Sequence, residues 1–185
     1  MAFGLGFSSN SIARAMPKPE VASQSKQQLR PKPTEASIAR NVQRNLVELP
    51  WYGIFDNLEY KVEGSTVVVS GQVLFPVTKE SVTNAVKGIR GVERVVNNVQ
   101  EESNSPMDNQ LRAAIYHALF SDGSPLFYGS LGVNPGIHII VSNGRVALDG
   151  VVNSQLEKQY AYAKARSVPG AISVTNNLRI ENSSK

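Results

Sequence analysis

Apolar residues recur with helical spacing at two places in the chain. They occupy positions 38, 42, 46 and 49 in the first stretch, and positions 111, 115 and 119 in the second. Spacings of three and four residues place these side chains along one face of an α-helix. The pattern therefore predicts one helix beginning near Glu35 and another beginning at Asp108, whose carboxylate lies close to the positive end of the helix dipole.

Strict alternation of apolar and polar positions follows each helix. It runs over residues 58–62 and 67–71 on either side of Glu63-Gly64, and over residues 137–141 before Asn143-Gly144. Asn-Gly between alternating stretches is a strong hairpin signal, because both turn residues tolerate a positive φ. Each stretch therefore predicts an antiparallel pair of strands.

A further helix and a last strand follow each hairpin. Helical spacing returns over residues 82–89 and 161–168, and alternation returns over residues 92–100 and 171–180. A strand, a helix and a second strand in one sheet imply a right-handed crossover and parallel pairing. We therefore predict an α+β fold of two repeated α-β-β-α-β units, each a three-stranded mixed sheet with two helices on one face.

The two units are copies of one another. Gly91 and Gly170 are 79 positions apart, as are Gly71 and Gly150, and this register continues through the Asn-Asn pair of each last strand. A register that never slips indicates an internal duplication. We expect domains at residues 35–103 and 106–182, with the four glycines at positions where a side chain would clash or φ is positive.

Residues 1–34 differ from the rest in composition. Residues 1–35 carry five basic and two acidic residues, a net +3, whereas residues 36–185 carry 14 and 13, a net +1. The Pro, Lys, Gln and Ser content of residues 16–34 predicts a disordered linker. The start has a short apolar stretch and a small-x-small "ARA" but no charged beginning, so a remnant export signal and a start without function both stay open.

Catalytic chemistry has no recognisable motif here. The chain has no cysteine and only two histidines, and we expect both His117 and His138 at the surface or half-buried. No nucleophile motif, phosphate-binding glycine loop or metal-ligand spacing is present, so we expect no enzyme, no metal and no cofactor. "GIRG" at 88–91 matches the G-x-x-G of RNA-binding loops, but it precedes a strand and the second copy lacks it. We also expect no nucleic-acid partner and, without a long apolar run, no transmembrane span.

Aromatic residues gather in the link between the first helix and the first strand of each copy. Such rings can enter a lipid headgroup region, and they can also cap a small core or pack against the sister domain. An arginine and a tyrosine on the second copy's first helix can add to the same surface, or belong to a solvated helix face. The candidates for ligand or lipid contact are Trp51, Tyr52, Phe55, Arg112, Tyr116, Phe120, Phe127 and Tyr128.

The repeated motifs resemble the BON domain, named after bacterial osmotic-shock and nodulation proteins. The stretches "VEGSTVVVSGQV…IRGVERVVNNV" at 62–99 and "VSNGRVALDGVV…VPGAISVTNNL" at 141–178 both fit its pattern. Residues 49–64 and 136–144 further resemble a tandem form found in exported bacterial proteins. The resemblance implies a binding module without catalytic residues, for which phospholipid surfaces are the leading proposed ligand.

These observations favour a non-enzymatic protein of the bacterial periplasm or envelope. Its expected partners are anionic phospholipid or envelope proteins, and its expected role is in envelope integrity or osmotic stress tolerance. A protein-interaction adaptor without lipid affinity is the alternative function. A cytoplasmic location is the alternative if the start of the chain carries no working export signal.

Overall fold

The computed structural model describes residues 32–121, 123–126 and 136–181. The predicted disordered tail and two of the aromatic candidates, Phe127 and Tyr128, lie outside these residues. Everything described belongs to one compact unit that begins at Lys32.

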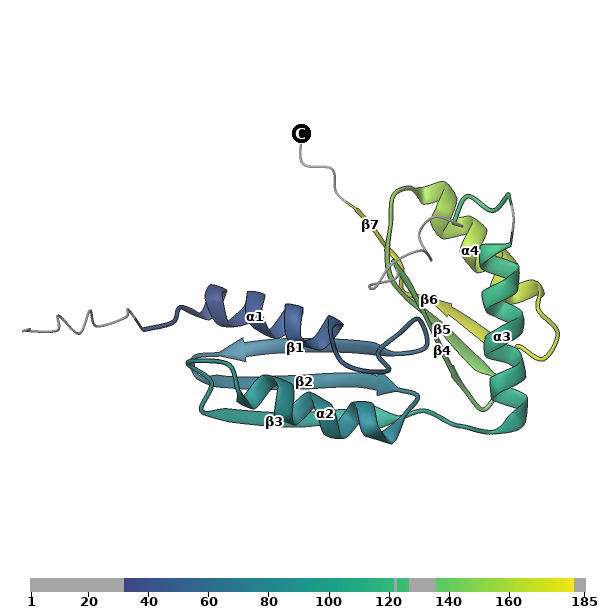
Figure 1. Cartoon of the computed structure of the whole chain (residues 1–185). Helices are drawn as coiled ribbons and strands as arrows, with labels where there is room; N and C mark the ends of the chain where they lie inside the picture. Colours follow the sequence, from purple (N-terminus) through teal and green to yellow (C-terminus); the bar gives the residue numbers. More distant parts are fainter. Residues whose placement is uncertain (1–31, 122, 127–135, 182–185) are drawn as a thin grey trace, which may run out of the picture. The chain divides into compact units, whose positions relative to one another are not determined.

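The first repeat has the predicted α-β-β-α-β order (Figure 1). The middle strand of its sheet pairs antiparallel with the first strand and parallel with the last, in the order β1-β2-β3. Its elements are α1 (Glu35–Val47), β1 (Asn57–Glu63), β2 (Thr66–Val73), α2 (Pro76–Lys87) and β3 (Arg94–Glu101).

The second repeat follows the same plan. Its central strand β5 pairs antiparallel with β4 and parallel with β6 and β7. Its elements are α3 (Pro106–Phe120), β4 (Ile137–Ser142), β5 (Arg145–Val152), α4 (Gln155–Ser167), β6 (Ser173–Asn176) and β7 (Arg179–Ile180). The α+β architecture of two α-β-β-α-β units is thus confirmed.

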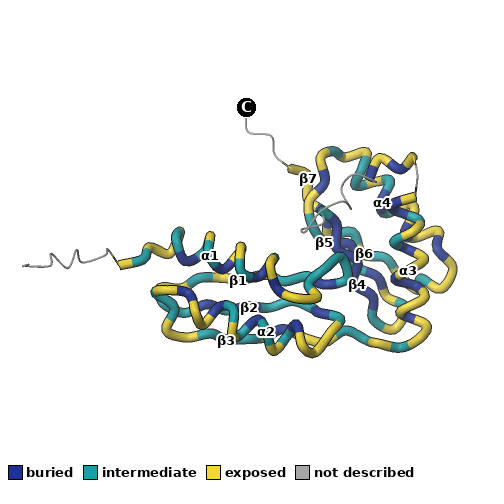
Figure 2. Tube along the Cα trace, viewed as in Figure 1, coloured by how far each residue is buried: buried dark blue, intermediate teal, exposed yellow. Residues whose placement is uncertain are grey.

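Each repeat has its own apolar core between its helices and one face of its sheet. In the first, Val67, Val69 and Val73 lie on the same face of β2 and cluster with buried residues of α1 and α2. In the second, Val146 and Leu148 of β5 cluster in the same way with α3 and α4. Figure 2 shows the buried positions along the strands and the inner faces of the helices.

The first asparagine of each Asn-Asn pair makes the same contact in both copies. The Asn97 side chain donates to the Lys79 carbonyl at 2.9 Å, and Asn176 donates to the Lys158 carbonyl at 3.0 Å. In each repeat this bond joins the last strand to the helix before it. The first asparagine of each pair therefore ties the last strand to the backbone of the preceding helix.

The last strand of the second copy departs from the prediction. We expected one strand over residues 171–180, but it is divided into β6 and β7 at Asn177-Leu178. Leu178 directs its N–H to the Asn176 side chain at 3.2 Å instead of to the sheet. Val99 makes the same bond to Asn97 in β3, which nevertheless continues unbroken to Glu101.

Two repeated glycines allow the backbone of a neighbouring strand to pass closely. Gly71 has φ 117° and Gly150 has φ 123°. A Cβ on Gly71 would lie 2.0 Å from the Asn57 carbonyl oxygen, and one on Gly150 would lie 2.2 Å from that of Gly136. Only glycine tolerates both a φ in this range and a backbone oxygen so close to the Cβ position. Each hairpin therefore requires glycine at this point.

We expect Gly71→Ala to lower the free energy of unfolding by about 2–4 kcal/mol, because it adds a backbone clash to a strained φ. Gly88→Ala is the matched control: Gly88 has φ −73°, and its added Cβ would lie 3.8 Å from the nearest atom. The control should be neutral or stabilising by about 0.4–1 kcal/mol. Urea unfolding of both variants measures this difference, and equal stabilities would contradict the assignment.

Candidate functional site

Trp51 stands out in the link between α1 and β1. It is the only tryptophan of the chain, and its side chain is 69% exposed. Its φ of 69° lies in the left-handed region, which bulky side chains rarely adopt. Such a conformation costs about 1–3 kcal/mol and persists only where the surrounding structure holds it. The indole is therefore held outward at an energetic cost.

Phe75 lies beside Trp51 and is also exposed. The two rings meet edge to face, with their centroids 6.2 Å apart. Phe75 is the N-cap residue of α2, and Val77 in the first turn of this helix is exposed as well. We call Trp51, Phe75 and Val77 the Trp51 patch. Sequence analysis had identified Trp51 but not Phe75 or Val77.

Phe55, from the same link, points into the second repeat. It is half-buried against that repeat's core and meets Tyr116 edge to face, with centroids 6.4 Å apart. Tyr116 in turn lies 5.3 Å from the ring of Phe120, which is buried. The structure therefore places these three candidates in packing contacts between and within the repeats.

Two further interactions fix the link. The Ile54 carbonyl accepts a 2.7 Å hydrogen bond from the N–H of Ile139, at the edge of the second sheet. The buried Asp56 carboxylate accepts from the N–H groups of Gly53 at 2.8 Å and Leu74 at 2.6 Å. Burial raises the pKa of Asp56, and these hydrogen bonds oppose the rise. The residues after Trp51 are thus held at both ends.

Arg112 is only 2% exposed, so the expectation of a solvated helix face is wrong for this residue. Its guanidinium donates to the carbonyls of Ser103 at 2.6 Å and Val141 at 2.5 Å. The Glu102 carboxylate lies 3.6 Å away. Arg112 faces inward because it satisfies the connector between the repeats and the end of β4, a role that leaves it little access to a ligand.

Asp108 binds the backbone of the β4–β5 hairpin turn in the second repeat. Its carboxylate accepts from the N–H groups of Asn143 at 3.0 Å and Gly144 at 2.9 Å. Burial by itself would raise the pKa of Asp108, but hydrogen bonds from the Ser103 side chain and from the turn outweigh it and lower the pKa to about 2. Glu35 makes the corresponding contact in the first repeat, accepting from the Gly64 N–H at 2.6 Å.

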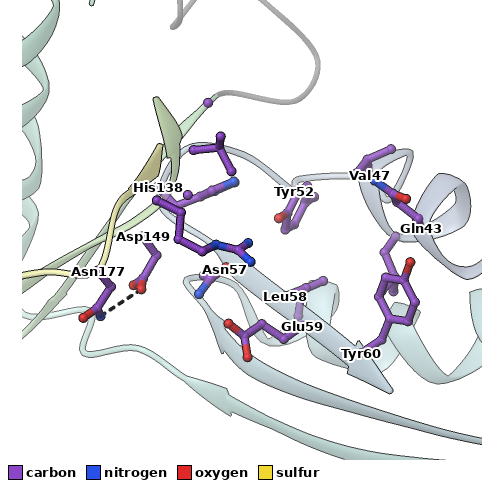
Figure 3. A pocket seen from close by; sticks show the side chains of 15 residues that line it. Gln43, Val47, Tyr52, Asn57, Leu58, Glu59, Tyr60, His138, Asp149 and Asn177 are labelled. Atoms are coloured by element: carbon purple, nitrogen blue, oxygen red, sulfur yellow. Dashed lines mark hydrogen bonds between the residues drawn. The ribbon is translucent and has the colours of Figure 1, made fainter. Parts of the chain in front are cut away.

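Tyr52 and His138 lie next to each other in the lining of a groove of about 780 Å³, to which α1, β1 and the second sheet also contribute (Figure 3). Their ring centroids are 5.8 Å apart. His138 is buried, where we had expected a surface or half-buried side chain, because the first repeat's link covers that face of β4. Burial lowers the pKa of His138 and raises that of Tyr52 to about 12. Both side chains are therefore uncharged at neutral pH.

Acidic side chains also line the groove. Its acidic residues are Glu59 and Asp149, and Asp149 accepts from the Asn177 side chain at 2.9 Å (Figure 3). Among the residues that the structure describes, no three His, Cys, Asp or Glu side chains come together as a metal site. The described helices likewise include none long and apolar enough to cross a membrane.

Comparisons with known proteins identify the repeats. The family model described as "BON domain" matches residues 34–102 and again residues 108–182. No curated protein matches the chain. Two solved structures that match belong to CdsD, a structural protein of the type III secretion system of Chlamydia trachomatis. The C-terminal domain of CdsD is 11% identical to this chain, and the match covers 80% of this chain and 99% of the CdsD domain. The second CdsD structure is 12% identical, and the match covers 76% of this chain and 90% of the CdsD chain. Both matches have a TM-score of 0.30, and a likeness this low supports no functional assignment.

Asp108→Asn should destabilise the protein by about 1–3 kcal/mol at pH 7, because one of two backbone N–H groups loses its acceptor. The pKa of Asp108 is about 2 in the folded protein and 3.8 ordinarily. The stabilisation is therefore complete above that ordinary value and is lost as the pH falls toward 2. Urea unfolding should show the two proteins converging over this range.

Glu80→Gln, at an exposed position of α2, is the control, and at each pH it should have the same free energy of unfolding as the parent protein. A constant difference between Asp108→Asn and the parent protein from pH 7 to pH 2 would contradict the role of the ionised carboxylate.

Proposed function

Because the chain belongs to the BON-domain family, we propose that it is a non-enzymatic binding module of the bacterial periplasm or envelope. It contacts phospholipid surfaces through the Trp51 patch and supports envelope integrity or osmotic stress tolerance. The observation that carries this proposal is the exposed indole of Trp51, held at φ 69° beside the exposed ring of Phe75.

The chemistry of the Trp51 patch suits a membrane interface. Tryptophan has a large apolar ring and a single N–H donor, so it is favoured at the level of the lipid headgroups. Phe75 and Val77 add apolar surface without a charge. A strained and exposed tryptophan costs stability, and binding at an interface is a function that offsets such a cost.

The charge distribution predicts how this contact depends on lipid and salt. Residues 36–185 carry a net charge of only +1, so the Trp51 patch should bind mainly by its apolar surface. Residues 1–35 carry +3, and each basic group near an anionic surface contributes about 1 kcal/mol. Salt should weaken this second contribution, which decays over a Debye length of about 8 Å at physiological ionic strength.

Phe75→Ala should weaken binding to phosphatidylcholine–phosphatidylglycerol vesicles by about tenfold, because it removes a ring's worth of apolar contact. Vesicle sedimentation measures the affinity. The single tryptophan provides a second readout in the same samples, since its emission should shift to shorter wavelength when the unmodified protein binds vesicles. Trp51→Ala should weaken sedimentation at least as strongly.

Leu156→Ala is the matched control, because Leu156 is 71% exposed on α4 and lies outside the Trp51 patch. It should bind vesicles like the unmodified protein. If the unmodified protein binds neither neutral nor anionic vesicles at low salt, the lipid proposal fails, and a protein-interaction adaptor that uses the same surface takes its place.

A further inference from the structure

The two repeats differ at their matching glycines before the last strand. Gly91 and Gly170 have nearly the same φ, 96° and 95°. In the first repeat, Pro33 lies over Gly91, because a Cβ built on this glycine would be 3.0 Å from both Cβ and Cγ of the proline ring. Pro33 belongs to the segment that enters α1, just before the N-cap residue Thr34. In the first repeat, the Pro33 ring therefore covers Gly91.

The second repeat leaves the same place open. Among the residues that the structure describes, a Cβ on Gly170 would come within 4 Å of Leu111 Cδ1 alone. Here the structure has a groove of about 450 Å³ at the beginning of α3, beside the β4–β5 turn. Polar side chains contribute to its lining, and its apolar and glycine positions include Met107, Leu111, Ala114, Pro169, Gly170 and Ile172.

Two exposed apolar side chains border this groove, and one of them stands where the first repeat has a charged residue. Ile172 is 75% exposed, and Met107 is 79% exposed. The residue 79 positions before Ile172 is Glu93, which accepts a 2.9 Å hydrogen bond from the Ser65 hydroxyl. The second copy thus has an apolar side chain where the first has a carboxylate, at a place that no proline of the described residues covers. Exposed apolar residues around an open groove are typical of an interaction site.

We propose that the groove over Gly170 binds an extended, proline-containing segment of a partner protein, with its proline ring on Gly170 as Pro33 lies on Gly91. A glycine at φ 95° leaves a flat backbone surface that a rigid ring can cover. An extended proline-containing segment loses little conformational entropy on binding, which is why such segments serve as ligands of apolar grooves. This site is separate from the Trp51 patch, and the proposal does not depend on lipid binding.

The probe is a fluorescently labelled peptide with the sequence of residues 30–35, Arg-Pro-Lys-Pro-Thr-Glu, titrated with the full chain and followed by anisotropy. We expect saturable binding that is lost when both prolines of the peptide are alanine. Ile172→Glu, which introduces the residue found in the first repeat, and Met107→Lys should each weaken binding by about tenfold or more. Both positions are exposed, so the variants should fold, which their thermal unfolding checks.

Leu156→Glu is the matched control and should bind the peptide like the unmodified protein. Binding that ignores both the peptide's prolines and Ile172→Glu would overturn the proposal, as would the absence of binding. A dimer in light scattering that Ile172→Glu dissociates would also overturn it, since the occupant would then be a second copy. Vesicle sedimentation reduced by Ile172→Glu would assign the groove to lipid instead.

Discussion

The link between α1 and β1 is the segment on which both the pairing of the repeats and the Trp51 patch depend. Its Ile54 carbonyl bonds to the edge strand of the second sheet, and Phe55 packs on the second core. The Asp56 carboxylate closes the segment by accepting two backbone N–H groups. These contacts use the residues after Trp51. The indole therefore stays exposed, and the Trp51 backbone is held in the left-handed region, which is unfavourable for a bulky residue.

The duplication gives two copies of one scaffold whose exposed edges have diverged. Both keep the close-approach glycines, the asparagine bond to the preceding helix and an acidic residue under the hairpin turn. The first copy covers Gly91 with Pro33, whereas in the second no described residue covers Gly170 in this way. The first copy also contributes the link that buries His138 of the second. The shared features determine the fold, and the differences supply the two surfaces that we propose for binding.

Features that depend on local pattern could be predicted from the sequence. Alternation, helical spacing and the 79-residue register predicted both sheets and the parallel last strands, because these follow from neighbours in the chain. Features that depend on tertiary packing could not. The contact of Trp51 with Phe75 joins two loops, and the burial of Arg112 follows from its bonds to a connector and a strand end. The same holds for His138. Alternation in β4 predicted that its side chain would lie on an exposed face, but the link of the other repeat covers that face.

The central claim is that the link holds Trp51 both exposed and immobile, and the fluorescence of this single tryptophan tests it most directly. Iodide quenching combined with time-resolved anisotropy measures the two properties together. In the unmodified protein the indole should be quenched freely, while its anisotropy decays only with tumbling of the whole molecule. Asp56→Asn, which removes one of two acceptors from the link, should add a fast nanosecond decay and leave quenching unchanged. A fast decay already present in the unmodified protein, or an indole shielded from iodide, would contradict the claim.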